Sequence, residues 1–255
     1  MTERGLAESR SQAQKFVMAG QVRVDGEVIL KSATPVPSDA RIDIEQGPRF
    51  VSRGGEKLEA ALLAFGLDDL HGRICVDVGA STGGFTDCLL QHGAAKVYAV
   101  DVGYGELHWK LRNNPQVVVM ERTNARYVTG FPEPVSLVTI DASFISLRIL
   151  LPVVRSWKVE PAGEIVALIK PQFEAGRAEV SRGDGVIHDP LIHRRVLEEI
   201  LEFAHAQGYA LRGLIRSPLK GPKGNTEFLV YLDLREGQSL EPAELIDQAL
   251  ATSDG

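Results

Sequence analysis

The chain has 255 residues, 44% of them hydrophobic and 24% charged, which is enough to bury one large α/β core beside a small additional module. Its formal net charge of −6 argues against a protein that binds polyanions through its overall charge. The two cysteines are too few for a disulfide framework and no early apolar run is long enough to cross a membrane, so we expect a cytoplasmic protein without bound metal.

The first 46 residues predict a small module of mixed helix and strand. A helix is expected over the apolar, helically spaced residues 13–18 and should end at Gly20. Two short apolar runs, 22–24 and 28–30, flank Asp25-Gly26, which is a strong signal for a two-residue hairpin turn. Residues 42–44 alternate like a further short strand, and residues 47–53 are expected to form a linker.

From Leu58 onward strands and helices alternate, which predicts a mostly parallel sheet with helices on both faces. The candidate strands are 74–78, 96–100, 117–120, 135–140, 165–169, 209–215 and 228–234. The last two are joined by a loop with proline and glycine rather than by a helix, so we expect the last strand to be antiparallel. Seven strands with a terminal hairpin are typical of Rossmann-like methyltransferases, whereas nicotinamide-binding Rossmann domains usually have six parallel strands.

A glycine-rich loop, Asp77 to Thr86, follows the first of these strands, and three chemistries could use it. A dinucleotide site needs a middle glycine where this chain has Ser81, whose side chain would crowd a pyrophosphate. A serine hydrolase is matched formally by the residues from Gly79 to Gly83, but its nucleophile elbow normally follows several sheet strands, and only one precedes Ser81. S-adenosylmethionine carries no phosphate and can lie on this turn, so a methyl-donor site is favoured.

Two polar residues at later strand ends fit the same interpretation. Asp101 ends the second strand, where a carboxylate can hold the ribose hydroxyls of the donor, and Asn124 follows the third strand, where a side chain can contact the adenine. Alone, Asp101 could equally be a turn or capping acid, and a single loop asparagine would mean little. The predicted donor contacts are Asp77, Gly79, Ser81, Gly83, Gly84, Phe85, Asp101 and Asn124.

Ionisable residues also stand where ligands of open α/β sheets bind, outside the carboxyl ends of the strands. Asp141 and Lys170 end two strands, and Glu227 precedes the last one. Lys57 begins the helix before the first sheet strand. Each could be an ordinary surface charge by itself, but together they predict a convergent cluster.

Two lysines with two acids suit methylation of a ribose 2′-hydroxyl, which needs a general base. A free lysine titrates near ~10.4, but burial and a second ammonium lower a lysine pKa, while neighbouring carboxylates raise it and fix its orientation. We assign Lys170 as the base and Lys57 as the electrostatic and substrate-orienting partner. Asp141 and Glu227 are expected to align the two lysines.

The ordered set of motifs resembles the TlyA family of bacterial ribosomal RNA 2′-O-methyltransferases, often called hemolysins, whose catalytic domain is similar to the FtsJ/RrmJ ribose methyltransferases. The segments that carry the resemblance are 3–10, 52–58, 77–86, 101–105, 121–124, 141–144 and 170–174. They extend over nearly the whole chain, and Lys57, Asp141, Lys170 and Glu227 fall on the family's catalytic tetrad. The short linker has Phe50 where some relatives have tryptophan.

The resemblance implies an S4-like RNA-binding domain over residues 1–46, whose first helix starts earlier in the family than Met1 does here. It implies a linker at 47–53, an FtsJ-like domain at 54–245 and a tail at 246–255. It also implies ribosomal RNA or ribosomal subunits as partner and a cytidine 2′-hydroxyl as target. The predicted RNA contacts are the basic residues Arg4, Arg10, Lys15, Arg23, Arg53, Arg216, Lys220 and Lys223.

Three other functions remain open at this point. A ribosome-assembly factor could bind RNA and the donor without catalysis, although the complete tetrad argues against it. A membrane-lytic protein is disfavoured because the chain has neither a spanning segment nor a long basic amphipathic helix. A methyltransferase for small molecules or proteins is disfavoured by the S4-like start and by the stretch 212–223, which has four basic residues and no acid.

Overall fold

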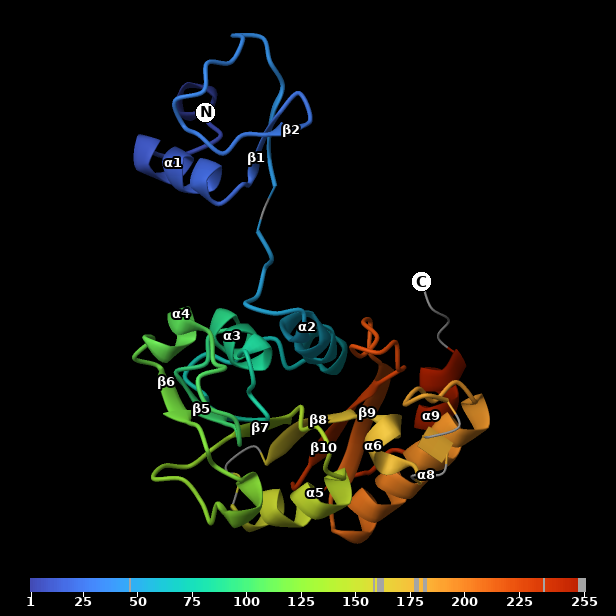
Figure 1. Cartoon of the computed structure of the whole chain (residues 1–255). Helices are drawn as coiled ribbons and strands as arrows, with labels where there is room; N and C mark the ends of the chain where they lie inside the picture. The colour runs from blue at the N-terminus through green and yellow to red at the C-terminus, as the bar shows by residue number, and fades with distance from the viewer. Residues whose placement is uncertain are drawn as a thin grey trace. The chain divides into compact units, whose positions relative to one another are not determined.

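The computed structural model describes residues 1–45, 47–157, 159, 163–176, 179–180, 183–235 and 237–251 (Figure 1). The chain forms two compact units, which divide between Arg49 and Phe50. Each unit has its own sheet. The predicted fold class, a seven-stranded methyltransferase sheet with a small N-terminal α+β domain, is confirmed.

The N-terminal unit places one helix beside a small antiparallel sheet of order β2-β1-β3. Its elements are η1 (Thr2–Arg4), α1 (Arg10–Met18), β1 (Val22–Val24), β2 (Glu27–Val28) and β3 (Ile42–Ile44). Ser9 caps α1 by accepting a hydrogen bond from the Gln12 amide, 3.2 Å away. Asp25 and Gly26 both have positive φ, as the predicted hairpin turn requires, but β2 is shorter than expected.

The C-terminal unit is built on a seven-stranded sheet of order β6-β5-β4-β7-β8-β10-β9. Its strands are β4 (Ile74–Val78), β5 (Lys96–Val100), β6 (Val117–Met120), β7 (Leu137–Ile140), β8 (Glu164–Ile169), β9 (Ala210–Arg216) and β10 (Phe228–Asp233). The strands β4 to β8 pair in parallel, and β10 runs antiparallel between β8 and β9, as predicted. The carboxyl ends of the parallel strands therefore meet at one edge of the sheet.

Helices cover both faces of this sheet, with α2 and α3 on one face and α5, α8 and α9 on the other (Figure 1). The helices are α2 (Gly54–Phe65), α3 (Gly84–Gln91), α4 (Trp109–Arg112), η2 (Ala125–Tyr127), α5 (Leu147–Ser156), α6 (Pro171–Glu174), α8 (Pro190–Ala206) and α9 (Pro242–Ala251). Along β8, Val166 and Leu168 join the core under α2 and α3, while Ile165, Ala167 and Ile169 join the opposite core. Strands buried on both faces explain why these segments are continuously apolar.

The two ends of the C-terminal unit differ from the expected boundaries. Phe50, placed in the linker by sequence, is buried in the core that α2 and α3 share. Residues 246–251 belong to α9 rather than to a tail, because Leu245, Ile246 and Ala249 pack into the core beside α8 and β9. The remaining tail residues, 252–255, lie outside the described residues.

Candidate active site

The glycine-rich loop between β4 and α3 contains two glycines with positive φ and close neighbours. Gly79 has a φ of 86°, and a Cβ there would lie 2.6 Å from the Asp141 carbonyl oxygen. Gly83 has a φ of 99°, and a Cβ there would lie 2.3 Å from the Leu111 side chain. The loop can therefore pack tightly against its neighbours and still leave its outer backbone open to a ligand.

Asp77, a predicted donor contact, lies behind the loop and lines neither of the hollows described below. Its carboxyl group accepts hydrogen bonds from the hydroxyls of Thr86 (2.7 Å) and Thr139 (3.3 Å). Complete burial raises the pKa of Asp77 to about 7. The residue ties the end of β4 to the first turn of α3 and so supports the loop from beneath.

A narrow cleft lies on the β5 and β6 side of the loop. It is lined by Ala80, Ser81, Ala99, Asp101, Gly103, Glu106, Leu107, Val119 and Glu121. The Asp101 carboxylate accepts hydrogen bonds from the amides of Ser81 (2.8 Å) and Gly103 (2.7 Å), so it is fixed at the cleft wall. Asn124 is not in this wall, because its side chain caps η2 by accepting from the Arg126 amide at 3.1 Å.

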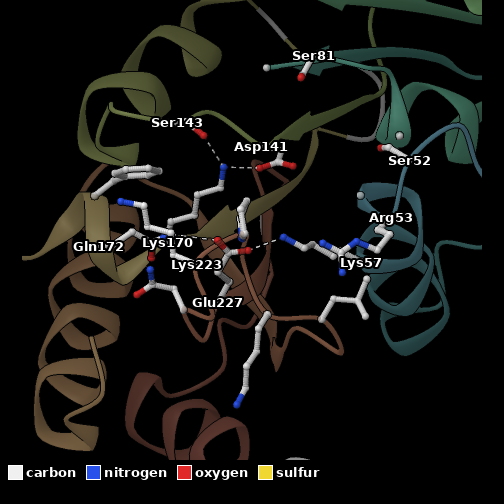
Figure 2. A pocket seen from close by; sticks show the side chains of 18 of the residues that line it. Ser52, Arg53, Lys57, Ser81, Asp141, Ser143, Lys170, Gln172, Lys223 and Glu227 are labelled. Carbon is white, nitrogen blue, oxygen red and sulfur yellow. Dashed lines mark hydrogen bonds and ion pairs between the residues drawn. The ribbon is translucent and has the colours of Figure 1, made fainter. Parts of the chain in front are cut away.

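A larger cavity of about 670 Å³ opens on the other side of the loop (Figure 2). The start of α2, the segments that follow β7 and β8, and the loop between β9 and β10 form its walls. Three predicted donor residues, Gly79, Gly84 and Phe85, line it, and Ser81 lines both hollows, whereas Gly83 packs against Leu111. Segments that are far apart in the sequence thus line one cavity beside the donor loop.

The four ionisable residues predicted to converge all line this cavity and form two ion pairs. Lys57 Nζ lies 2.5 Å from Glu227 Oε2, and Lys170 Nζ lies 2.6 Å from Asp141 Oδ1 (Figure 2). Lys57 is 9% exposed and Glu227 is 1% exposed, so the first pair is almost wholly removed from water. Buried pairs of this kind are strongly destabilising when one partner is removed, because the other charge is left uncompensated.

Burial and pairing act against each other on the Asp141 carboxyl group. Burial raises the pKa of Asp141, while the ammonium of Lys170 and the more distant one of Lys57 lower it, and burial has the larger effect. Two carboxyl groups and two amines therefore line one cavity, and one of the carboxyl groups has a pKa that burial raises. Such clusters are characteristic of functional sites.

This fold agrees with the comparisons with known proteins. A family model described as FtsJ-like methyltransferase matches residues 50–234. The chain belongs to the FtsJ-like methyltransferase family. A second model, the S4 domain, matches residues 1–42, so the N-terminal unit is an S4 domain.

Relatives with both parts extend over nearly the full chain. The YqxC protein of Bacillus subtilis is 47% identical over 257 residues, which cover 96% of this chain and 89% of that protein. The 16S/23S rRNA (cytidine-2′-O)-methyltransferase TlyA of Mycobacterium tuberculosis is 45% identical over 253 residues, covering 97% and 92%. The solved structure of a hemolysin-like protein from Streptococcus thermophilus is 42% identical, with a TM-score of 0.74 and coverage of 97% and 92%.

S-adenosylmethionine is the methyl donor of this methyltransferase family, as expected from the loop, and the residues present fit it. The cleft has apolar walls from Ala99, Leu107 and Val119, and its acids Asp101 and Glu121 are suited to ribose hydroxyls. Ala80 and Ser81 of the loop line both the cleft and the cavity. Carboxylates rather than cations line the cleft, so it does not suit the phosphates of a dinucleotide, and S-adenosylmethionine has none.

The basic residues predicted to contact RNA fall into three groups. Arg53, Lys220 and Lys223 line the cavity with exposed side chains. Arg10 and Lys15 are exposed on α1 of the S4 domain. The other three make intramolecular contacts: Arg4 donates to the carbonyls of Ser38 and Ala40, Arg23 pairs with Glu45, and Arg216 donates to Thr226 Oγ1.

Sequence reasoning missed four polar or aromatic residues of the cavity. Ser143 accepts a hydrogen bond from Lys170 Nζ at 2.9 Å, and Gln172 donates one to Glu227 Oε1 at 3.1 Å. Phe144 is 90% exposed, with its ring centroid 4.9 Å from that of Phe173. All four lie within three residues of Asp141 or Lys170, so their place directly after these two strand-end residues could have predicted that they line the same cavity.

Two further observations bear on the expectations about metal and membrane. Among the described residues, we find no group of three or more histidine, cysteine, aspartate or glutamate side chains arranged to hold a metal ion. No helix in the described part of the chain is both long and apolar enough to span a bilayer.

Proposed function

We propose that this protein transfers a methyl group from S-adenosylmethionine to the 2′-hydroxyl of a cytidine in ribosomal RNA. The observation that carries the proposal is the pair of buried ion pairs, Lys57 with Glu227 and Lys170 with Asp141, beside the donor loop. The 45% identity to a ribosomal RNA cytidine methyltransferase over nearly the full chain supports the same reaction.

In the proposed reaction, Lys170 is the general base. Bound S-adenosylmethionine supplies a methyl carbon that its sulfonium makes electrophilic. The uncharged amine of Lys170 accepts the proton of the 2′-hydroxyl while the ribose oxygen bonds to that methyl carbon and the carbon–sulfur bond breaks. Asp141 holds the Lys170 amine at 2.6 Å and stabilises the ammonium that forms.

The second ion pair has an orienting role in this proposal. Lys57 Nζ is held at 2.5 Å by Glu227, which also accepts from Gln172. Its positive charge lies on the cavity wall, where it can attract the ribose oxygen and a neighbouring phosphate. Lys57 therefore serves as the electrostatic partner and Glu227 as the residue that aligns it.

The cavity walls favour RNA over a small-molecule or protein acceptor. Phe144 presents an exposed aromatic face beside Phe173, and sequence-specific RNA recognition commonly stacks an unpaired base on such side chains. Exposed Arg53, Lys220 and Lys223 at the same cavity suit a phosphate backbone. The matched S4 domain is consistent with an RNA substrate, which the protein would meet in the cytoplasm as ribosomal subunits.

The test is transfer of a labelled methyl group from S-adenosylmethionine to ribosomal subunits or their RNA. We expect Lys170→Ala to abolish transfer while donor binding stays close to that of the wild type; because the variant leaves Asp141 without its ion-pair partner, its melting temperature should fall, and the assay is run well below it. Lys96→Ala, which removes a lysine at the start of β5, away from the cavity, is the matched control and should remain active. Undiminished transfer by Lys170→Ala would show that another group is the base, and RNA binding without transfer by the wild type would indicate an assembly factor.

A further inference from the structure

Ser143 contacts the Lys170 amine beside Asp141, and neither the family matches nor the relatives assign it a role. Its Oγ accepts a hydrogen bond from Lys170 Nζ at 2.9 Å, while Asp141 Oδ1 lies 2.6 Å from the same nitrogen (Figure 2). Ser143 lies two residues after Asp141, in the segment between β7 and α5, and lines the large cavity.

The number of partners fixes the direction of the lone pair on this amine. An uncharged lysine amine is tetrahedral, with a carbon, two N–H bonds and one lone pair around the nitrogen. Ser143 accepts one of these N–H bonds, and the Asp141 carboxylate attracts the same nitrogen at 2.6 Å, so the lone pair is favoured to point away from both groups. Because Lys170 is part of the cavity wall, that direction is available to a group inside the cavity. With Asp141 as the only acceptor, the amine could rotate and turn the lone pair away.

The segment that carries Ser143 is held at both ends, and at its start the Asp141 amide donates to the Val78 carbonyl at 2.9 Å. Phe144 has a φ of 63°, an uncommon backbone conformation for a residue with a side chain, and such conformations persist only where the surroundings impose them. Further along, Glu174 accepts hydrogen bonds from the Ser146 hydroxyl (2.5 Å) and the Leu147 amide (2.8 Å). The Ser143 hydroxyl is thus presented to Lys170 by a braced loop rather than by a free one.

The other charged groups near the amine do not replace this contact. Asp141 already faces it, and the ion pair of Lys57 with Glu227 lies on another wall of the cavity. The Phe173 ring has its centroid 5.7 Å from Lys170 Nζ and carries no oxygen or nitrogen atom that could accept a hydrogen bond from the amine. Among the described residues, Ser143 is therefore an acceptor for Lys170 in addition to the carboxylate of Asp141.

We propose that Ser143 is a positioning residue that aims the lone pair of Lys170 at the acceptor hydroxyl. The inference rests on the proposed function, because it requires Lys170 to be the general base. A base that is correctly placed but wrongly oriented loses most of its effect, since small misalignments of reacting groups cost about 10- to 100-fold in rate. Ser143 would act on the rate of the chemical step and leave the binding of both substrates unchanged.

The test compares Ser143→Ala, Ser143→Thr and a matched control, Ser156→Ala, whose hydroxyl donates to the Val153 carbonyl at the far end of α5. We expect Ser143→Ala to lower kcat by about 10- to 100-fold, with KM for RNA and Kd for S-adenosylmethionine within twofold of the wild type. Ser143→Thr retains a hydroxyl at the same position and should recover most of kcat. Ser156→Ala should match the wild type.

A wild-type kcat for Ser143→Ala, a loss confined to KM or Kd, or a failure of threonine to restore kcat would each overturn the inference. Equal melting temperatures of the variants exclude an effect through unfolding. The variant Lys170→Ala shows whether the positioning role of Ser143 has failed or the proposed function itself has failed. If Lys170→Ala is inactive and Ser143→Ala is fully active, only the positioning role is lost, whereas an active Lys170→Ala removes the base itself.

Discussion

The carboxyl group of Asp77 is buried beneath the donor loop, where two threonine hydroxyls are its hydrogen-bond partners. Burial raises its pKa from 3.8 to about 7, so the folded protein keeps a proton there that the unfolded chain loses. Between these two values the folded state binds more protons than the unfolded state. The contribution of Asp77 to the free energy of unfolding therefore falls as the pH rises from about 4 to about 7, and it is constant above that range.

Asp77→Asn removes this titration and keeps groups that can hydrogen-bond to Thr86 and Thr139. We expect the free energy of unfolding of the variant, relative to the wild type, to increase between pH 4 and pH 7, by an amount on the order of a few kcal/mol. Urea denaturation of both proteins across this range measures it. A constant difference between the two proteins would show that Asp77 is ionised throughout.

The site residues that could be predicted from the sequence are ionisable residues that stand directly at the end of a predicted strand. Asp141 and Lys170 follow apolar strands, and parallel strands must bring their carboxyl ends to one edge of the sheet. Asn124 satisfied the same rule, yet it caps η2, because the rule places a residue but does not orient its side chain. Ser143 and Gln172 were missed since their partners, Lys170 and Glu227, are distant in sequence and only the fold brings them together.

At the scale of whole elements, Glu174 connects the two segments that carry Asp141 and Lys170. It lies at the end of α6 and accepts hydrogen bonds from the first residues of α5, at Ser146 and Leu147. Burial is the main cause of the raised pKa of Glu174. The start of α5 and the short helix after β8 are thereby fixed to each other at the floor of the site.

Replacement of Glu174 should loosen this connection. We expect Glu174→Ala to lower the free energy of unfolding by about 1–3 kcal/mol, because the Leu147 amide and the Ser146 hydroxyl lose a buried partner. Glu174→Gln keeps an oxygen acceptor and should lose less than half as much. Chemical denaturation measures both, with the exposed Glu202→Ala on α8 as the control. A change below about 0.5 kcal/mol for Glu174→Ala would contradict the account.

The elements themselves were largely predictable, and the failures have physical causes. The sheet strands agreed closely because continuous apolar runs between glycine-rich and polar turns leave little choice of position. β2 was overestimated because hydrophobic residues 29 and 30 extend beyond the paired part of the hairpin. Helix α9 was missed although Leu245, Ile246 and Ala249 have helical spacing, because it follows the last strand, where a tail was expected.

At the scale of the molecule, an acidic chain has to recognise an acidic substrate through local basic surfaces. The S4 domain exposes Arg10 and Lys15 on α1, whereas Arg53, Lys220 and Lys223 lie around the cavity. The net charge alone disfavoured nucleic acid, and the motifs of the N-terminal domain, the basic stretch 212–223 and the predicted catalytic residues reversed that inference.

Reversal of the charges on α1 tests the contribution of the S4 domain. We expect the double variant Arg10→Glu, Lys15→Glu to weaken RNA binding and to reduce the slope of log affinity against log salt by ~1 for each phosphate that the variant no longer neutralises. Glutamate at position 10 lies in the first turn of α1 and is favoured by the helix dipole, whereas glutamate at position 15 lies in the last turn and is disfavoured by about 0.3–1 kcal/mol, so circular dichroism of the variant checks that the helix persists. Binding of S-adenosylmethionine, which uses the other domain, serves as the internal control. Unaltered RNA affinity would show that α1 does not contact the substrate.

The protein is proposed to transfer a methyl group from S-adenosylmethionine to a ribose of ribosomal RNA, with the residues of the two ion pairs beside the donor loop as its catalytic groups. The most direct measurement is nucleoside mass spectrometry of ribosomal subunits that have been incubated with S-adenosylmethionine and either the wild-type protein or Lys170→Ala. We predict that 2′-O-methylcytidine increases with the wild type and stays at background with the variant. A methyl group on a base or on a different nucleoside, or equal amounts of 2′-O-methylcytidine with both proteins, would contradict the account.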